Sequence, residues 1–271
     1  HTILLTHNDG DHVGALTPLL DQGLTRIGRL FMLREPQREQ STFQSLFRKA
    51  FELHRAGKLI IQRLESPLAV WTDTNTRCEI RVVYPDFVGV ETARTINKAS
   101  AIILLIVRGQ TLAIWPGDNV LGCVADKAGG LSPLLMHGPH HGAPQDVAHK
   151  SAWSSLDHIN PTRVFASLGT NNTHSHPNKK YLGMLTRRNS IVSCSELTTE
   201  CDRRCTEKGR PILDSATRLG LWPNRGGIPC RGCMRFTLHD GKLVVDQLET
   251  EHQRRVTNLD RPMCRISSRS R

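Results

Sequence analysis

The stretch LLTHNDGDHVGAL, residues 4–16, places four side chains that can bind metal ions within six positions. Imidazole and carboxylate groups are ligands that suit zinc, manganese and iron. The stretch follows an apolar run and precedes a glycine, so we expect its polar residues to lie in a turn between a strand and a helix. A structural alternative is a turn in which Asp11 caps the helix. The four candidate ligands are His7, Asp9, Asp11 and His12.

Further clusters of the same residue types each follow a predicted strand. Because loops at one end of an α/β sheet converge, we expect all of the clusters to share one site. Crowded carboxylates without a cation would raise one another's pKa values, whereas two divalent cations would more than neutralise three of them and leave room for a bound hydroxide. The pattern predicts a two-metal centre that activates water for hydrolysis. The later clusters are Asp118, His140 with His141, and His174 with His176.

The elements that must position these residues are those of an α/β protein. Hydrophobic periodicity predicts an amphipathic helix in which Phe43, Leu46, Phe47, Ala50 and Phe51 share one face. Other predicted helices cover residues 13–20 and 178–187, and a short helix follows residue 120. Predicted strands cover residues 2–6, 26–33, 58–64, 78–84, 101–108, 111–115, 132–138 and 162–170, and a last hairpin pairs 234–238 with 243–248.

Composition and charge restrict the class of protein. A chain of 271 residues can bury a full core, and its 38% hydrophobic content fits a globular protein. The net charge of +11 favours an anionic substrate or partner such as nucleic acid. We expect no membrane span, because the longest apolar run stops at Arg108, and without a secretory signal we favour a cytoplasmic location. The first residue is His1, so we expect the natural N-terminus upstream. The oligomeric state is open.

We expect three segments along the chain. Residues 1–195 form the hydrolase core, and residues 196–250 form an extension that contains cysteines and the last hairpin. Residues 251–271 form a basic tail that we expect to be disordered. Two cysteine pairs in the extension could bind a structural zinc ion, and reduced, partly buried thiols are the alternative. The zinc hypothesis uses Cys201, Cys205, Cys230 and Cys233.

Four motifs in order resemble those of the metallo-β-lactamase fold. THNDGDHVGAL resembles the signature His-x-His-x-Asp-His with aspartate in place of the second histidine, as in the hydrolase domain of ComEC-type DNA-uptake proteins and their free-standing relatives. NKASAIILLIVRGQTLAIWPGD, LLMHGPHHGAP and ASLGTNNTHSHP resemble the later motifs of that family. The resemblance implies a four-layer αββα fold. The family has further strands before the first motif, and this sequence starts after them.

The resemblance also implies roles for individual residues. His7, Asp9, Asp11, His12, Asp118 and His140 are implied as metal ligands, with Asp118 bridging two divalent cations, zinc or manganese. Asp11, His141 and His176 are implied as catalytic residues. His141 and His176 could ligate, orient the scissile group or protonate the leaving group, and His174 is the weaker neighbour. Asn97 and Ser100 match a position that carries a metal-binding histidine in other branches, and Ala143 with Pro144 stands where relatives more often carry serine.

The sequence leaves three functions open. The first is a metal-dependent hydrolase of phosphodiesters, with DNA or RNA among the candidate substrates. Such a protein would be a phosphodiesterase or a nuclease. The second is a hydrolase of a small molecule such as a lactone, a thioester or a cyclic nucleotide. The third is a catalytically inactive module that binds nucleic acid through its basic tail and cysteine pairs.

Overall fold

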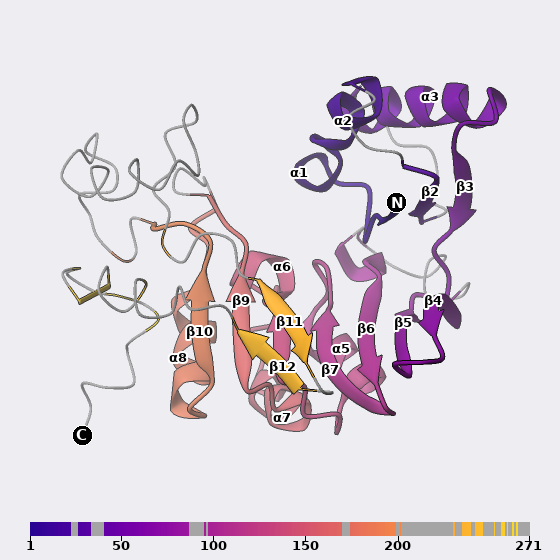
Figure 1. Cartoon of the computed structure of the whole chain (residues 1–271). Coiled ribbons are helices and arrows are strands. Elements are labelled where there is room, and N and C mark those ends of the chain that lie inside the picture. Colours follow the sequence, from indigo (N-terminus) through magenta and orange to yellow (C-terminus); the bar gives the residue numbers. More distant parts are fainter. Residues whose placement is uncertain are drawn as a thin grey trace.

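The computed structural model describes two packed sheets with helices on their outer faces (Figure 1). The described residues are 1–22, 27–33, 41–86, 95, 97–169, 174–198, 201, 230, 235–239, 242–245, 252, 256–257, 259, 262 and 264. Within these residues the chain alternates strands and helices, so the α/β class is confirmed. None of the described helices combines the length and the apolar sequence needed to cross a bilayer.

The smaller sheet contains three parallel strands in the order β1-β2-β3. The strands are β1 (Thr2–Leu4), β2 (Arg29–Met32) and β3 (Ile60–Arg63). Its helices are α1 (Gly10–Val13), α2 (Leu16–Gln22) and α3 (Ser41–Arg55). Leu46 and Ala50 of α3 are fully buried against this sheet in one apolar cluster with Leu30 of β2. The spacing of four between the two α3 residues is the spacing of neighbours on one helix face.

The larger sheet has seven strands in the order β10-β9-β8-β7-β6-β5-β4. Strands β7 to β10 are parallel, whereas β4 to β7 pair in antiparallel fashion. The strands are β4 (Leu68–Asp73), β5 (Cys78–Tyr84), β6 (Ile102–Val107), β7 (Gln110–Trp115), β8 (Leu135–His137), β9 (Arg163–Ala166) and β10 (Ile191–Cys194). The associated helices are α5 (Leu121–Ala128), α6 (Pro139–Gly142), α7 (Ser151–Ile159) and α8 (Lys179–Arg187), and a single turn, η1 (Asn97–Ala99), precedes β6.

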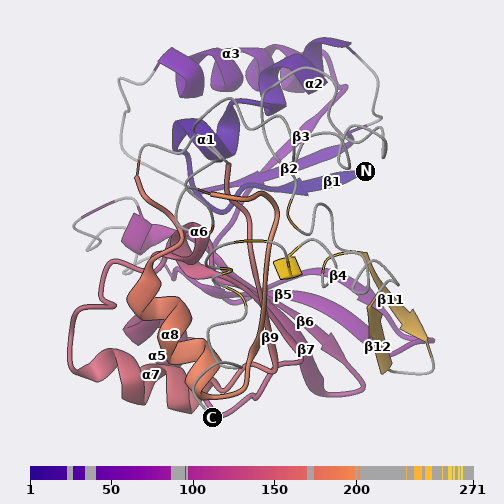
Figure 2. The same ribbon diagram turned by 90° about the vertical axis from the view of Figure 1, so that its left-hand side faces the viewer.

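Alternation along β6 shows how the layers stack. Ile102 and Leu104 pack in the cluster that contains α5, α7 and α8, whereas Ile103 packs in the cluster with Phe31 and Leu64 next to the smaller sheet. Successive side chains of a strand point to opposite faces, so β6 is covered on both sides. Figure 2 shows the resulting order of layers, with α2 and α3 outermost, then the two sheets, then α5, α7 and α8. The four-layer αββα architecture is therefore confirmed.

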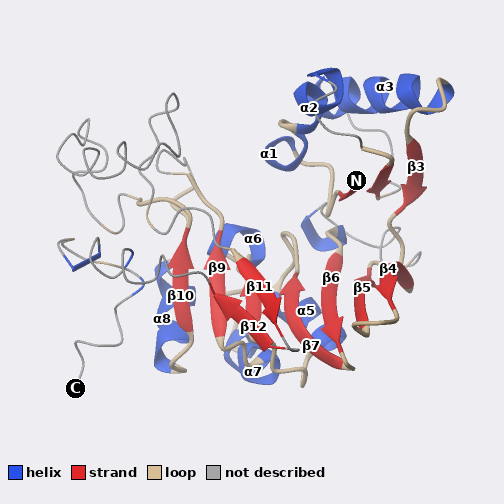
Figure 3. Cartoon of the chain, viewed as in Figure 1, coloured by secondary structure: helices blue, strands red, loops and turns tan. Residues whose placement is uncertain are grey.

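Several elements differ from those that the sequence predicts (Figure 3). Strands β4 and β10 and helix α7 are present without a predicted counterpart, and the first predicted helix is broken into α1 and α2. The predicted apolar face of α3 is wrong at Phe47 and Phe51, whose side chains are each 47% exposed. They stack on each other with ring centroids 6.2 Å apart instead of entering the core.

Several described residues of the C-terminal part of the chain lie in the core of the larger sheet. Strands β11 (Phe236–His239) and β12 (Lys242–Val245) form the expected hairpin. Cys201 and Cys230 are buried in the apolar cluster of α5, α7 and α8. Val256 and Leu259 are buried in the same cluster, so at these positions the structure departs from the disorder that the sequence predicts. Two members of the predicted zinc set, Cys205 and Cys233, lie outside the described residues.

Candidate metal centre

The candidate ligands lie in the loops that follow four strands. These are β1 of the smaller sheet and β7, β8 and β9 of the larger sheet. Because β7, β8 and β9 are parallel neighbours, their carboxyl ends lie side by side. The loop after β7 carries Asp118, the loop after β8 carries His140 and His141, and the loop after β9 leads to His176. The loop after β1 adds the first motif from the smaller sheet. The hydrogen bond from the Ala101 amide to the Thr6 carbonyl, 2.8 Å long, ties this loop to the larger sheet.

Gly117 allows Asp118 to enter the centre. Its φ of +56° lies in the left-handed region, and a Cβ atom at this position would lie 2.8 Å from Cβ of Ser100 and 3.1 Å from Cβ of Thr6. Only glycine adopts this conformation without strain, and only glycine fits the space. The next residue, Asn119, is buried and donates to the Ser100 carbonyl. The turn after β7 is thereby locked against the segment that precedes β6.

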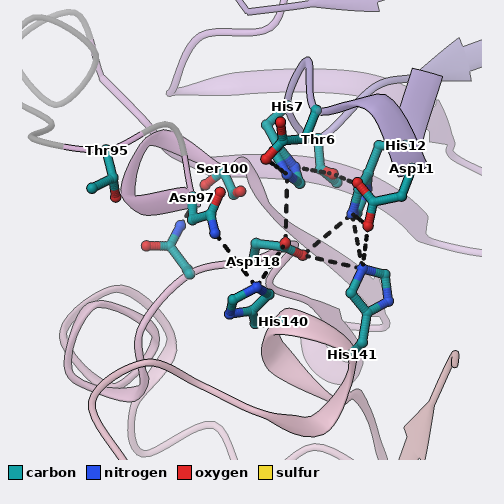
Figure 4. Close-up of polar contacts among 12 residues, drawn as sticks. Thr6, His7, Asp11, His12, Thr95, Asn97, Ser100, Asp118, His140 and His141 are labelled. Carbon is teal, nitrogen blue, oxygen red and sulfur yellow. Dashed lines mark hydrogen bonds and ion pairs between the residues drawn. The ribbon is translucent and has the colours of Figure 1, made fainter. Parts of the chain in front are cut away.

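The carboxylate of Asp118 lies in the middle of four imidazoles (Figure 4). Its Oδ2 atom is 3.6 Å from Nε2 of His7 and 3.6 Å from Nε2 of His140. Its Oδ1 atom is 3.3 Å from Nε2 of His12 and 3.9 Å from Nε2 of His141. The two oxygens thus face two different pairs of histidines, which is the arrangement that a carboxylate needs to bridge two cations.

Asp11 joins the half of the centre that contains His12 and His141. Its Oδ2 atom is 3.0 Å from Nε2 of His141 and 3.9 Å from Nε2 of His12. The ligand atoms of these three residues lie within 4.8 Å of one another, and those of His7, His12 and Asp118 do so too. Asp9 lies at the other half, with Oδ2 4.0 Å from Nε2 of His7. The structure therefore offers two overlapping groups of ligands, which share His12.

The hydroxyl of Thr6 and the carbonyl of Ser167 orient the histidine rings. Oγ1 of Thr6 is 3.3 Å from Nδ1 of His7 and 3.4 Å from Nδ1 of His12, so it can accept from both rings. Nδ1 of His141 lies 2.7 Å from the Ser167 carbonyl oxygen, which can only accept, so this nitrogen carries the proton. In each case Nε2 faces the centre and is the ring atom that can bind a cation. Hydrogen bonds of this kind commonly fix metal-binding histidines.

The nitrogens and carboxylate oxygens of this cluster favour a positive charge among them. Nε2 of His12 and Nε2 of His141 are only 3.3 Å apart, and both face carboxylate oxygens. Nε2 of His7 is fully buried and has no hydrogen-bond partner among the described residues. Facing lone pairs repel and a buried unsatisfied nitrogen is costly, and a cation or a proton relieves both. The donor set of imidazoles and carboxylates therefore fits divalent metal ions.

The pKa values of the acids follow from the same contacts. Burial by itself would raise the pKa of Asp118, but the imidazoles of His12 and His7 hold it far below its ordinary value. The hydrogen bond with His141 lowers the pKa of Asp11 to about 2. Burial would lower the pKa of His141, but Asp11, Asp118 and the Ser167 carbonyl together raise it. Both carboxylates are thus ionised and ready to bind a cation.

The loop after β8 holds its two histidines in a strained backbone conformation. His140 and His141 have φ values of +48° and +55°, in the left-handed region that non-glycine residues seldom adopt. Gly142 follows with φ of +85°, and a Cβ atom there would lie 3.1 Å from the Cβ atoms of Ala166 and Pro177. Such strain persists only where the surrounding structure enforces it, and it clusters at functional sites. Here it turns both imidazoles toward Asp118.

A pocket of about 790 Å³ opens over the centre. His176 lies beside the two loop histidines, with its ring centroid 5.1 Å from that of His140 and 6.2 Å from that of His141. Nδ2 of Asn97 is 3.5 Å from Nε2 of His140. The pocket is lined by Asp9, Asp11, Asn97, Asp118, His140, His141, Ser167, Leu168, Gly169, His174 and His176.

The structure brings the predicted site residues together, and which of them bind metal stays a prediction. His7 and His12 complete the centre below the pocket. Ser100 is buried behind the Gly117 turn and does not line the pocket. The sequence reasoning missed Thr6 and Ser167. Thr6 carries a usable signal, since it directly precedes the first histidine, whereas Ser167 acts through its backbone carbonyl, which any residue possesses.

Comparisons with known proteins give little independent information. No model of a protein family matches the sequence, and no curated protein matches it. Among solved structures, the chain is similar to Igni18, described as a novel metallo hydrolase from the hyperthermophilic archaeon Ignicoccus hospitalis KIN4/I. The identity is 14% and the TM-score 0.41, over 71% of this chain and 75% of that chain.

Proposed function

We propose that this protein is a metal-dependent hydrolase with two divalent cations, zinc or manganese, at the His/Asp centre. The observation that carries the proposal is the position of Asp118, whose two carboxylate oxygens face separate pairs of imidazoles at 3.3–3.9 Å. One cation would be held by His7, Asp9 and His140, and the other by Asp11, His12 and His141. Asp118 would contribute to both.

Bound cations would supply a water molecule of lowered pKa and positive charge for a developing anionic oxygen. The chain itself supplies position. Ser167 holds the His141 ring, and Thr6 holds the rings of His7 and His12. Burial, with the neighbouring His140 and His141, lowers the pKa of His176 to about 4. Its imidazole is thus neutral near neutral pH, and its ring N–H is suited to donate a hydrogen bond to the scissile group.

We favour a phosphodiester, with DNA or RNA among the candidates, as the substrate. Asp9, Asp11 and Asp118 bring three negative charges to the centre, so two divalent cations would leave it with a net positive charge. The chain as a whole carries a net charge of +11. Both features favour an anionic substrate.

A second candidate, hydrolysis of a small molecule such as a lactone, a thioester or a cyclic nucleotide, is favoured by two features of the pocket. The described residues that line the pocket include no lysine or arginine. A groove that follows a nucleic-acid backbone normally carries such side chains. A volume of about 790 Å³ is also in the range of pockets that enclose small ligands.

The test is an activity assay with the full chain loaded with Mn²⁺ or Zn²⁺. The substrates are bis-p-nitrophenyl phosphate, single-stranded and double-stranded DNA, RNA, cyclic nucleotides and a panel of lactones and thioesters. A phosphodiesterase that acts on nucleic acid should cleave bis-p-nitrophenyl phosphate, DNA or RNA. Its binding to DNA should weaken steeply as salt is added. Cleavage confined to cyclic nucleotides, lactones or thioesters would support the second candidate.

Matched variants distinguish the loss of the metal centre from unspecific effects of a substitution. Asp118→Ala should abolish turnover and reduce the metal content, whereas Asp73→Ala, which changes a partly exposed carboxylate at the end of β4, should alter neither. A metal-free wild-type protein that binds DNA without cleaving any substrate would instead identify a binding module. Unchanged activity in Asp118→Ala would refute the proposed centre.

A further inference from the structure

The side-chain amide of Asn97 lies at the edge of the His/Asp centre. Asn97 is partly buried and lines the pocket. Its Nδ2 atom is 3.5 Å from Nε2 of His140, and that nitrogen is in turn 3.6 Å from Oδ2 of Asp118 (Figure 4). The amide therefore points toward the place where His140 would hold a cation. Asn97 itself is not among the proposed ligands.

Backbone contacts fix the position of Asn97. It is the first residue of η1, and its carbonyl accepts from the Ser100 amide at 3.1 Å. The hydroxyl of Tyr84, at the end of β5, donates to the Lys98 carbonyl at 2.9 Å. The side chain of Asn119 donates to the Ser100 carbonyl. None of these bonds uses the Asn97 side chain, so η1 places the amide at the pocket without engaging it.

A bound cation would change the acceptor that this amide meets. The acceptor nitrogen of a neutral imidazole has a single lone pair, which can accept a hydrogen bond or bind a cation but cannot do both. The distance of 3.5 Å between Nδ2 of Asn97 and Nε2 of His140 is at the outer limit for a hydrogen bond, so the amide loses little when a cation takes that lone pair. Its N–H group then needs another acceptor, and an oxygen of a substrate held at the same cation would supply one.

We propose that Asn97 is a substrate-binding residue, which donates a hydrogen bond from Nδ2 to an anionic oxygen of the substrate, such as a phosphoryl oxygen, beside His140. The described residues that line the pocket include no lysine or arginine, so an oxyanion there depends on the cations and on neutral donors. A donor that is already in position stabilises such an oxygen without rearrangement. The inference rests on the proposed function, because it requires a cation at the centre.

The first test measures the binding of inorganic phosphate to the Mn²⁺-loaded full chain by isothermal titration calorimetry. Asn97→Ala should bind Mn²⁺ as tightly as wild type but phosphate at least about tenfold more weakly. Asn97→Asp keeps the shape of the side chain but has no N–H group and repels an anion, so it should bind phosphate more weakly still. Asn75→Ala, at an exposed position between β4 and β5, is the matched control and should bind phosphate normally. Wild-type affinity for phosphate in both Asn97 variants would overturn the proposal.

The second test observes the hydrogen bond itself. Zinc is diamagnetic, so the side-chain amide protons of the zinc-loaded, nitrogen-15-labelled protein can be followed by NMR. The resonances of Asn97 are those that disappear in Asn97→Asp. Phosphate should move one of them downfield in the zinc-loaded protein and leave both in place in the metal-free protein. Phosphate binding that leaves these resonances unmoved would contradict the assigned role.

Two other roles for Asn97 give different results. An amide oxygen that binds the cation would make Asn97→Ala weaken Mn²⁺ binding and Asn97→Asp strengthen it. An amide that only orients the His140 ring would make both variants weaken Mn²⁺ binding, with phosphate affinity following the metal content. Either result would overturn the proposal. As a substrate-binding residue, Asn97 should instead lower kcat/KM for bis-p-nitrophenyl phosphate by at least about tenfold in Asn97→Ala at unchanged metal content.

Failure of this inference is distinguishable from failure of the proposed function. Wild-type protein that binds no Mn²⁺ at the His/Asp centre would refute the proposed function and, with it, the role of Asn97. Wild-type protein that binds Mn²⁺ and cleaves a substrate, while the Asn97 variants bind phosphate normally, would refute only the role of Asn97. Wild-type protein that binds Mn²⁺ but no phosphate would also refute that role.

Discussion

Nε2 of His141 lies 3.0 Å from Oδ2 of Asp11, although 130 positions separate the two residues. Asp11 belongs to α1 beside the smaller sheet, and His141 belongs to the loop after β8 of the larger sheet. The contact therefore exists only where the two sheets meet. It joins an acid of lowered pKa to an imidazole whose other nitrogen is held by the Ser167 carbonyl. Because both side chains are held in position, the pair can bind a cation with little rearrangement.

The first prediction concerns metal affinity at this pair. His141→Ala removes an imidazole whose lone pair faces Asp11, so we expect the affinity for Mn²⁺ to fall by at least about tenfold. Isothermal titration calorimetry of the metal-free protein measures this change. His149→Ala is the control. His149 also lies between β8 and β9, but it is exposed and does not line the pocket. Equal affinities for the two variants would exclude His141 from the metal centre.

The second prediction concerns the turn before Asp118. Gly117→Ala combines a positive φ with a collision against Ser100, so we expect a loss of stability of about 2–4 kcal/mol and a damaged metal site. Gly109→Ala is the control. Gly109 also has a positive φ, +80°, but a Cβ atom there would meet nothing within 4 Å, so we expect a loss of only about 1 kcal/mol. Urea unfolding compares the two, and similar losses would contradict the packing argument.

The third prediction is a pH dependence of stability in the metal-free protein. Burial lowers the pKa of His137 to about 4, from an ordinary value of 6.5. Between these values the unfolded chain binds a proton that the folded chain does not. The contribution of His137 is therefore present above about pH 6.5 and is lost as the pH falls toward about 4.

Replacement of this histidine isolates its contribution from those of other titrating groups. We expect His137→Gln to lose less stability than wild type over that pH interval, by on the order of 1–3 kcal/mol. Thermal unfolding at a series of pH values measures the difference. Parallel pH profiles for the two proteins would show that His137 titrates normally in the fold.

The fourth prediction concerns the start of α5, directly after the Asp118 turn. The carboxylate of Asp146 accepts from the Leu121 amide at 2.8 Å and from the Gly122 amide at 2.9 Å. These amides have no partner within the helix, so Asp146→Ala should cost about 1 kcal/mol. Asp126→Ala, at an exposed position of the same helix, should cost less than half of that. Chemical denaturation checks both values, and a neutral Asp146→Ala would show that solvent replaces the cap.

The amino-acid sequence determined the types of ligand and their positions relative to the strands. His7 and Asp118 each follow an apolar run that forms a strand, and polar residues between strand and helix are readable because turns demand them. The α/β class follows from the alternation of the two periodicities. Asn178 begins α8 as predicted, because its side chain accepts from the Lys180 and Tyr181 amides, a local interaction that sequence alone specifies.

Only the tertiary structure decided which of these groups face one another. The division of the four histidines between the two oxygens of Asp118 depends on how two sheets pack, and no local pattern records that packing. The exposure of Phe47 was unreadable for the same reason, since a helix with several apolar positions does not show which of them its neighbours cover. The sequence did not predict strand β10, because an edge strand needs a partner to define it. It did not predict the role of Ser167, because a backbone carbonyl carries no sequence signal.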